Sequence, residues 1–164
     1  MAVHEFELFH GIVLTKLVRS DRPITLRMIE TRPAEAWSAY TLNNEVDLFI
    51  KHSTTPRTVA RGGGGKSWTF VFGVEQLHQM ALSTSKREVY VALVGGDREV
   101  KTRDMQVCLL RPAELRNLID LTSDSPQTLT VRYAPGKRLR LLKERKEKLR
   151  IPKNRLDTWD VPGS

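Results

Sequence analysis

The sequence predicts an α+β fold, with a single mixed or mostly antiparallel sheet and with an N-terminal helix and two short helices packed on it. Apolar residues recur at helical spacing near the N-terminus, and short β-prone segments follow. Short turns join most neighbouring segments, which favours antiparallel pairing because parallel strands need a longer crossover. At 164 residues the chain is long enough for one core. We expect a core domain over residues 1–135 and a basic C-terminal segment over residues 136–164 that can dock on it.

The first helix is the element with the clearest periodicity. Phe6, Phe9, Val13 and Leu17 fall on one helical face. The expected helices cover residues 4–19, 74–82 and 112–120. The expected strands cover residues 24–28, 37–42, 46–52, 67–72, 89–94, 104–110 and 129–133. Residues 89–94 are apolar throughout, which is typical of a central strand that is buried on both faces.

Turn residues separate these elements. Asn43-Asn44 is expected to form a turn, because asparagine tolerates the left-handed backbone region. Residues 53–66 are expected to form a loop with four consecutive glycines, which are expensive to order.

The net charge is concentrated near the C-terminus. Residues 137–155 contain ten cations and two anions, which leaves +8, and the other 145 residues carry 17 cations and 17 anions. The ten cations are Lys137, Arg138, Arg140, Lys143, Arg145, Lys146, Lys148, Arg150, Lys153 and Arg155. Closely spaced cations gain most from a closely spaced row of phosphates, so this segment predicts a polyanionic partner, DNA or RNA.

Two conformations remain open for this basic segment. Leu139, Leu142 and Leu149 share a helical stripe, whereas residues 138–141 alternate as in an edge strand. In both cases the leucines can dock on the body while the cations stay in solvent.

The glycine loop partly matches a phosphate-binding loop, over residues 60–67. That chemistry needs a helix after the loop, and here the β-prone residues 68–72 follow. We therefore expect a hairpin connection whose Arg57, Arg61 and Lys66 supplement the phosphate contacts.

Trp68, Phe70 and Phe72 alternate along one strand and so share one face. Such a row is expected in the core. The alternative is a base-stacking platform, because residues 66–71 resemble part of the aromatic strand motif of RNA-recognition domains.

The helix followed by strands resembles the PD-(D/E)XK nuclease superfamily. That resemblance implies a Mg²⁺-dependent active site, for which Glu7, Asp47 and Lys51 are the candidate residues. The following strand, residues 67–72, has no carboxylate to complete a metal site.

Five further stretches resemble a family of small uncharacterised bacterial proteins. They cover residues 37–40, 48–53, 68–72, 91–96 and 151–155. The resemblance implies no activity, and it implies that residues 148–155 belong to the fold.

Three functions follow as hypotheses. The leading one is a non-enzymatic nucleic-acid-binding protein of low sequence specificity, without metal or cofactor. The alternatives are the Mg²⁺-dependent nuclease and a structural or homo-oligomeric interaction protein. No signal-peptide pattern or membrane-length apolar run is present, and the single Cys108 lies in an apolar segment. We expect a cytoplasmic protein with an inert buried thiol and no membrane partner.

Overall fold

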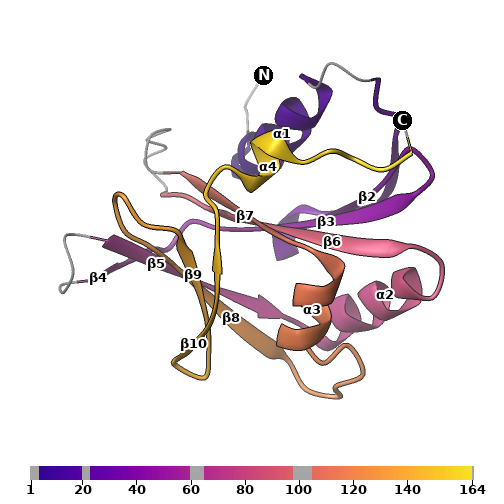
Figure 1. Ribbon diagram of the computed structural model, residues 1–164. Coiled ribbons are helices and arrows are strands. Elements are labelled where there is room, and N and C mark those ends of the chain that lie inside the picture. Colours follow the sequence, from indigo (N-terminus) through magenta and orange to yellow (C-terminus); the bar gives the residue numbers. More distant parts are fainter. Residues whose placement is uncertain (1–3, 20–22, 60–64, 98–104, 164) are drawn as a thin grey trace.

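The computed structural model describes residues 4–19, 23–59, 65–97 and 105–163 of the chain. Within them the fold is α+β, and it contains two five-stranded sheets instead of the single sheet expected. We call them sheet A and sheet B. In Figure 1 helices α1 and α4 lie above sheet A, and sheet B lies below it.

Sheet A is built from the first three strands and two later ones. Its strand order is β1-β2-β3-β6-β7. All neighbours are antiparallel except β3 and β6, which are parallel. The strands are β1 (Leu26–Arg32), β2 (Trp37–Leu42), β3 (Val46–Ser53), β6 (Glu88–Gly95) and β7 (Gln106–Leu110).

Sheet B is antiparallel throughout and has the order β10-β9-β8-β5-β4. Its strands are β4 (Arg57–Val59), β5 (Gly65–Phe72), β8 (Gln127–Tyr133), β9 (Leu139–Lys143) and β10 (Lys146–Ile151). The basic segment therefore forms two strands of this sheet and no helical stripe. Residues 139–141 are in a strand, as the second alternative expected, but β9 lies inside the sheet and β10 is its edge, because the segment folds back on itself as a hairpin.

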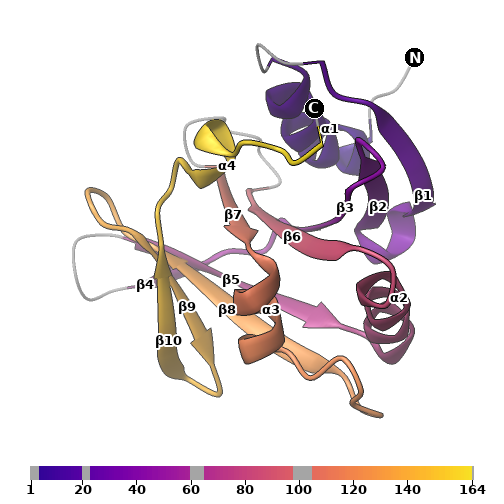
Figure 2. The ribbon, with the colours of Figure 1, turned by 45° about the vertical axis from the view of Figure 1, so that its right-hand side comes forward.

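The helices are divided between the two sides of sheet A. Helix α1 packs on one side, together with the short C-terminal helix α4. Helices α2 and α3 pack on the other side, at one end of the space between the sheets, as Figure 2 shows. The helices are α1 (Glu5–Val18), α2 (Val74–Thr84), α3 (Pro112–Leu118) and α4 (Arg155–Thr158), with a 3₁₀ turn η1 at Pro33–Glu35.

Two apolar cores result, and sheet A is a wall of both. The inner core lies between the sheets and contains Trp37, Phe49, Trp68 and Phe70. The outer core lies between sheet A and α1 and contains Phe9. Strands β2, β3 and β6 are buried along almost their whole length, as expected for strands with a packed layer on each face.

The expectation of one sheet was wrong because it was based on neighbouring segments pairing in order. Strand β3 pairs with β6, and the chain between them supplies β4 and β5 to the second sheet and α2 as part of the crossover. The alternation of buried and exposed residues in β5 is typical of a sheet with one open face, whereas β2 is buried throughout. That difference separates an outer sheet from a central one.

Candidate functional site

Four arginines lie in one row across the outer face of sheet B. In the strand register Arg57 pairs with Ser67, Ser67 with Arg132, and Arg132 with Arg140. Arg140 in turn pairs with Arg150. Each of the five strands thus contributes one residue to this line, and four of the five residues are arginines. We call Arg57, Arg132, Arg140 and Arg150 the arginine row.

The alternation of β5 explains why this row points outward. Trp68, Phe70 and Phe72 are buried in the inner core, so the intervening residues face the opposite side. Residues that are directly paired across strands share a face, so the partners of Ser67 point outward with it. Val71, on the same face, is 50% exposed, and the α-helices lie toward sheet A in Figures 1 and 2. The outer face is therefore open to solvent.

One carboxylate accompanies the arginine row. Glu147 Oε1 lies 3.5 Å from Arg140 Nε and 3.3 Å from Arg150 Nε. Arg57 and Arg132 have no ion pair within the described part of the chain, and Arg132 Nε is buried without a hydrogen-bond partner there. Glu147 carries one negative charge against the four positive charges of the row, so it reduces the positive potential there without removing it.

A second group of cations lies at the closed end of the β9–β10 hairpin. Arg145, Lys146 and Lys148 are exposed there, and we call them the hairpin-end cations. The connection has two residues, Glu144 and Arg145, with φ values of 53° and 66°. Two left-handed residues are typical of a type I′ turn, which matches the twist of the flanking strands.

Three of the ten predicted phosphate-binding cations instead have structural contacts. Lys143 donates hydrogen bonds to Leu118 O at 2.7 Å and Gln127 Oε1 at 2.9 Å. Lys153 donates to Ala134 O at 3.1 Å and lies 4.6 Å from the centre of the Tyr133 ring. Lys143 therefore stabilises the end of α3 and the start of β8, and Lys153 stabilises the loop after β8.

Arg155 is the third of these structural cations. It donates to Leu109 O at 3.0 Å and pairs with Glu114, whose carboxylate also accepts the Arg111 N–H at the start of α3. Lys137 and Arg138 are exposed in the loop before β9.

The cations predicted to act together on the glycine loop do not share one site. Arg57 belongs to the arginine row, whereas Lys66 pairs with Asp97 at 3.9 Å. Arg61 lies outside the described residues.

Arg132 is the candidate site residue that the sequence analysis missed. It lies outside the basic segment and is the centre of the row. Its position between the inward-facing Val131 and Tyr133 was the available signal. The charge count grouped cations by distance along the chain, whereas the strands group them by register.

The candidate nuclease residues are not brought together. Leu48 and Ile50 of β3 face α1, so Asp47 and Lys51 face the inner side of sheet A. Glu7 is exposed on α1, on the other side of that sheet. Asp47 accepts a 2.8 Å hydrogen bond from Thr41 and lies 3.7 Å from Arg87. No group of three metal-ligating side chains occurs among the described residues.

Lys51 belongs to a polar network beneath α2. It donates to Gln76 Oε1 at 3.0 Å and lies 5.6 Å from the centre of the Trp37 ring. Burial lowers the pKa of Lys51 to about 8, against a smaller opposite effect of Glu35. The Gln76 oxygen also accepts the Gly73 N–H, which satisfies the first turn of α2.

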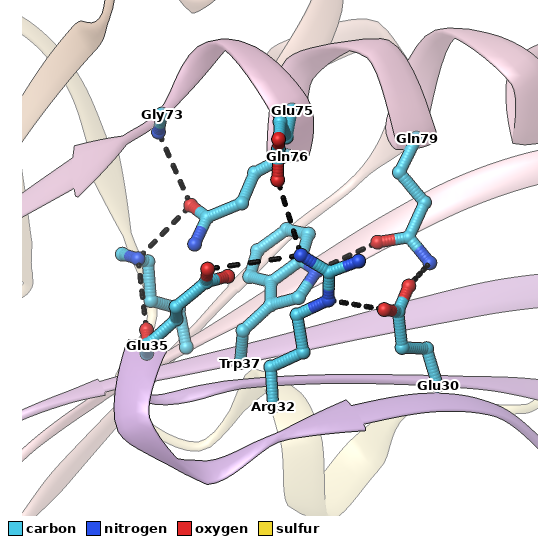
Figure 3. A network of polar contacts seen from close by, with 9 residues as sticks. Glu30, Arg32, Glu35, Trp37, Gly73, Glu75, Gln76 and Gln79 are labelled. Carbon is cyan, nitrogen blue, oxygen red and sulfur yellow. Dashed lines mark hydrogen bonds and ion pairs between the residues drawn. The ribbon is translucent and has the colours of Figure 1, made fainter.

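Above Lys51 the network is dominated by charged pairs. Arg32 contacts Glu30, Glu35 and Glu75, and Gln79 bridges Trp37 Nε1 and Glu30, as Figure 3 shows. The hydrogen bond that Arg32 Nε donates to the Glu30 carboxylate is the largest cause of the raised pKa of Arg32. These pairs join β1 to α2, so the network holds the helix on the sheet.

A serine and two histidines form a chain beneath α1. His10 Nδ1 lies 2.6 Å from Ser38 Oγ, and His10 Nε2 lies 2.7 Å from His52 Nδ1. This is the order of a nucleophile, a base and an orienting group. Ser38 is 0% exposed, however, so a substrate carbonyl has no access to its Oγ. The chain therefore satisfies buried polar groups between α1 and sheet A.

The remaining two sites are structural. Trp68, Phe70 and Phe72 lie in the inner core, which confirms the core interpretation over the stacking platform. Cys108 is 1% exposed, and burial raises the pKa of its thiol to about 12. The expectation of a buried thiol is confirmed, and a buried thiol with a raised pKa is a poor nucleophile.

Known proteins add no independent indication of function. No protein-family model matches the chain, and no curated protein and no solved structure matches it either. None of the helices in the described ranges is long and apolar enough to cross a membrane.

Proposed function

We propose that this chain is a nucleic-acid-binding protein that contacts the phosphate backbone through the outer face of sheet B. The observation that supports this most strongly is the arginine row, because four strands that are separate in sequence place an arginine at the same register position. Guanidinium groups are suited to phosphate, since their planar fork can donate two hydrogen bonds to one anion.

The charge of the surroundings favours a polyanion over a single anion. Arg145, exposed in the β9–β10 turn, adds positive charge at the end of the two strands that carry Arg140 and Arg150, whereas Lys146 pairs with the inward-facing Lys143 and lies on the opposite face. Within the described part of the chain, Glu147 is the one carboxylate that forms ion pairs with the row. Backbone contacts position a nucleic acid without specifying its sequence, so the proposed binding has low sequence preference.

The proposal is tested by measuring the affinity for a fluorescent oligonucleotide of about 20 nucleotides over a range of salt concentrations. Binding should weaken steeply between about 50 and 200 mM salt, because each phosphate contact contributes about 0.9 to the slope of log K against log salt. Changing Arg57, Arg132 and Arg150 to glutamine should flatten that slope by about 2 to 3. Affinity that does not depend on salt would contradict the proposal.

A matched control removes the same charge elsewhere. Arg27, Lys86 and Arg116 are exposed on sheet A and on the segments near it, so changing them to glutamine should leave the slope nearly unchanged. Equal losses in the two triple variants would show that net charge alone governs binding.

Glu147→Gln provides a test by gain of binding. The substitution releases Arg140 and Arg150 from their carboxylate partner, and the affinity for nucleic acid should rise by about 3-fold to 10-fold. Weaker binding by this variant would argue against contact at the arginine row.

A further inference from the structure

The arginine row divides into two halves that differ in how their charges are neutralised. On the β9–β10 side, the Glu147 carboxylate lies 3.5 Å from Arg140 and 3.3 Å from Arg150. On the β4–β8 side, Arg57 and Arg132 form no ion pair within the described part of the chain. Ser67 lies directly between these two arginines in the strand register. This half therefore has two guanidinium groups without an anion.

The β9–β10 half shows how far an arginine on this face can reach. Glu147 is paired with Leu142, so it lies one strand across from Arg140 and two residues further along. Such diagonal positions are about 7–8 Å apart, and Arg140 Nε nevertheless approaches the carboxylate to 3.5 Å. Arg57 and Arg132 are each paired directly with Ser67, one strand spacing of about 4.8 Å away. Both side chains are therefore long enough to contact one group held above Ser67.

The spacing of the β4–β8 half fits a tetrahedral anion. Arg57 and Arg132 are two strand spacings apart, or about 9.6 Å. Charge-assisted hydrogen bonds of about 2.8 Å, one from each side, leave about 4 Å between them, which is enough for a phosphate group. In the other half the two arginines are one spacing apart, and there they share a planar carboxylate of the chain itself.

The surroundings of Ser67 supply donors and no negative charge on the adjoining register line. The Ser67 hydroxyl can donate to a phosphate oxygen. Arg132 Nε is buried and has no acceptor among the described residues, which is costly for a donor. The next register line places Thr69 and Thr130 beside Ser67 and Arg132, and their hydroxyl oxygens lie 3.4 Å apart. An anion above Ser67 would thus meet hydroxyl groups and guanidinium groups.

From this arrangement we infer that Arg57, Ser67 and Arg132 form a binding site for a single phosphate group. The inference rests on the proposed function, because the site is one contact within the arginine row. The two guanidinium groups neutralise the anion from opposite sides, and the serine hydroxyl donates from the sheet below. A nucleic-acid backbone, a phosphorylated strand end and inorganic phosphate share this tetrahedral oxyanion.

Inorganic phosphate tests the site without a polymer. In NMR titrations of the full chain at constant ionic strength, the backbone amide signals of Arg57, Ser67 and Arg132 should shift and saturate. The affinity for phosphate should be about 10-fold or more above that for chloride. No saturable response at these residues, or an equal response to chloride, would overturn the inference. Binding of an oligonucleotide by the same sample would then leave the proposed function in place.

A pair of neutral variants tests the serine. Ser67→Ala changes no charge and should weaken phosphate binding by about 3-fold to 10-fold. Thr128→Ala removes another exposed hydroxyl from the same face, opposite Val71, and should have no effect. Equal affinities of these two variants for phosphate would remove Ser67 from the site and overturn the inference.

A pair of double variants tests which half of the row holds the anion. Arg57→Gln combined with Arg132→Gln should abolish saturable phosphate binding. Arg140→Gln combined with Arg150→Gln removes the same charge from the other half and should weaken binding by less than about 3-fold. Equal losses in the two double variants, with the fold intact by circular dichroism, would overturn the assignment to this half.

Two oligonucleotides of one sequence, with and without a 5′-phosphate, distinguish the sources of the phosphate group. Inorganic phosphate should displace both at constant ionic strength. Tighter binding of the phosphorylated strand would assign the site to a strand end, and equal binding would assign it to the backbone, and either result supports the site. Failure of phosphate to displace either strand would overturn the inference. Saturable phosphate binding without oligonucleotide binding would overturn the proposed function alone.

Discussion

At the scale of single residues, the buried histidines show how a polar group is held in an apolar core. His10 is 1% exposed, between Ser38 and His52, and its ring centre lies 4.1 Å from that of Phe6. Burial is the largest cause that lowers the pKa of His10, to about 3, with a further contribution from His52. The pKa of His52 is also lowered, chiefly by burial. Both rings therefore stay neutral near neutral pH.

The histidines should make the protein sensitive to acid. In the folded protein His10 stays unprotonated until the pH falls to about 3. Below pH 6.5, the pKa of His10 in the unfolded chain, the unfolded chain is protonated at this residue. Stability is therefore complete above that pKa and falls as the pH drops, by about 1.4 kcal/mol per pH unit for this residue. When the pH is lowered from 6.5 to 5, the free energy of unfolding of His10→Gln should fall by about 2 kcal/mol less than that of the native chain, measured by guanidinium unfolding.

The control for this prediction is His78→Gln. His78 is exposed on α2, so its removal should leave the pH dependence of unfolding unchanged. An identical loss of stability at acid pH in His10→Gln and in the native chain would contradict the assignment.

At the scale of elements, the β9–β10 hairpin combines a favourable turn type with unfavourable residues. Glu144 and Arg145 both have positive φ, where a side chain costs about 1–2 kcal/mol. The β2–β3 hairpin uses the same backbone with Asn43 and Asn44, at φ values of 53° and 55°, and asparagine tolerates that region. The basic turn therefore retains strain that the asparagine turn avoids.

Removing that strain should raise the stability of the protein while weakening its binding to nucleic acid. Arg145→Gly is expected to raise the free energy of unfolding by about 1 kcal/mol, because glycine adopts positive φ without a steric cost. The same change should weaken nucleic-acid binding, since it removes a hairpin-end cation. Asn44→Gly is the matched comparison, and it should change stability by only a few tenths of a kcal/mol. Destabilisation by Arg145→Gly in chemical unfolding would contradict the turn assignment.

At the scale of the whole molecule, the two cores meet where β6 ends. A Cβ on Gly95 would lie 2.4 Å from the Trp68 indole of the inner core. One on Gly96 would lie 2.2 Å from the Phe9 ring of the outer core. Trp68 Nε1 also donates a 2.8 Å hydrogen bond to Gly96 O. Close packing at these adjacent glycines ties sheet B to β6 and β6 to α1.

We therefore expect the two cores to unfold together. Gly95→Ala should destabilise the protein by about 1–3 kcal/mol through overpacking against Trp68. Hydrogen exchange in α1 and in β8 should be accelerated by the same free energy, because sheet A is shared. Gly11→Ala, on a helix position with open space for a methyl group, should instead stabilise by about 0.5–1 kcal/mol. Acceleration confined to β8 would show that the cores are independent.

Local patterns were sufficient to predict most of the elements. The expected strand at residues 37–42 is confirmed as β2, and the turn at Asn43-Asn44 is confirmed by two positive φ values. Helix α1 follows from the spacing of Phe9, Val13 and Leu17, all of which are buried. These features depend on contacts between residues a few positions apart, which a single sequence displays directly.

These local patterns could not predict which strands pair when they are far apart in the sequence. Arg57 and Arg150 belong to one surface only because β4, β5, β8, β9 and β10 pair in a particular order and register. The division into two sheets depends on the parallel pairing of β3 with β6 across an intervening hairpin and helix. Neither depends on local spacing.

The sequence alone established that the positive charge is concentrated near the C-terminus and that most segments are helical or extended. The tertiary structure decided which cations face solvent, and it turned Lys143, Lys153 and Arg155 to structural contacts while adding Arg132 to the open face. The physical reason is that charge and local conformation are properties of neighbouring residues, whereas a binding surface is made by strand register across the whole chain.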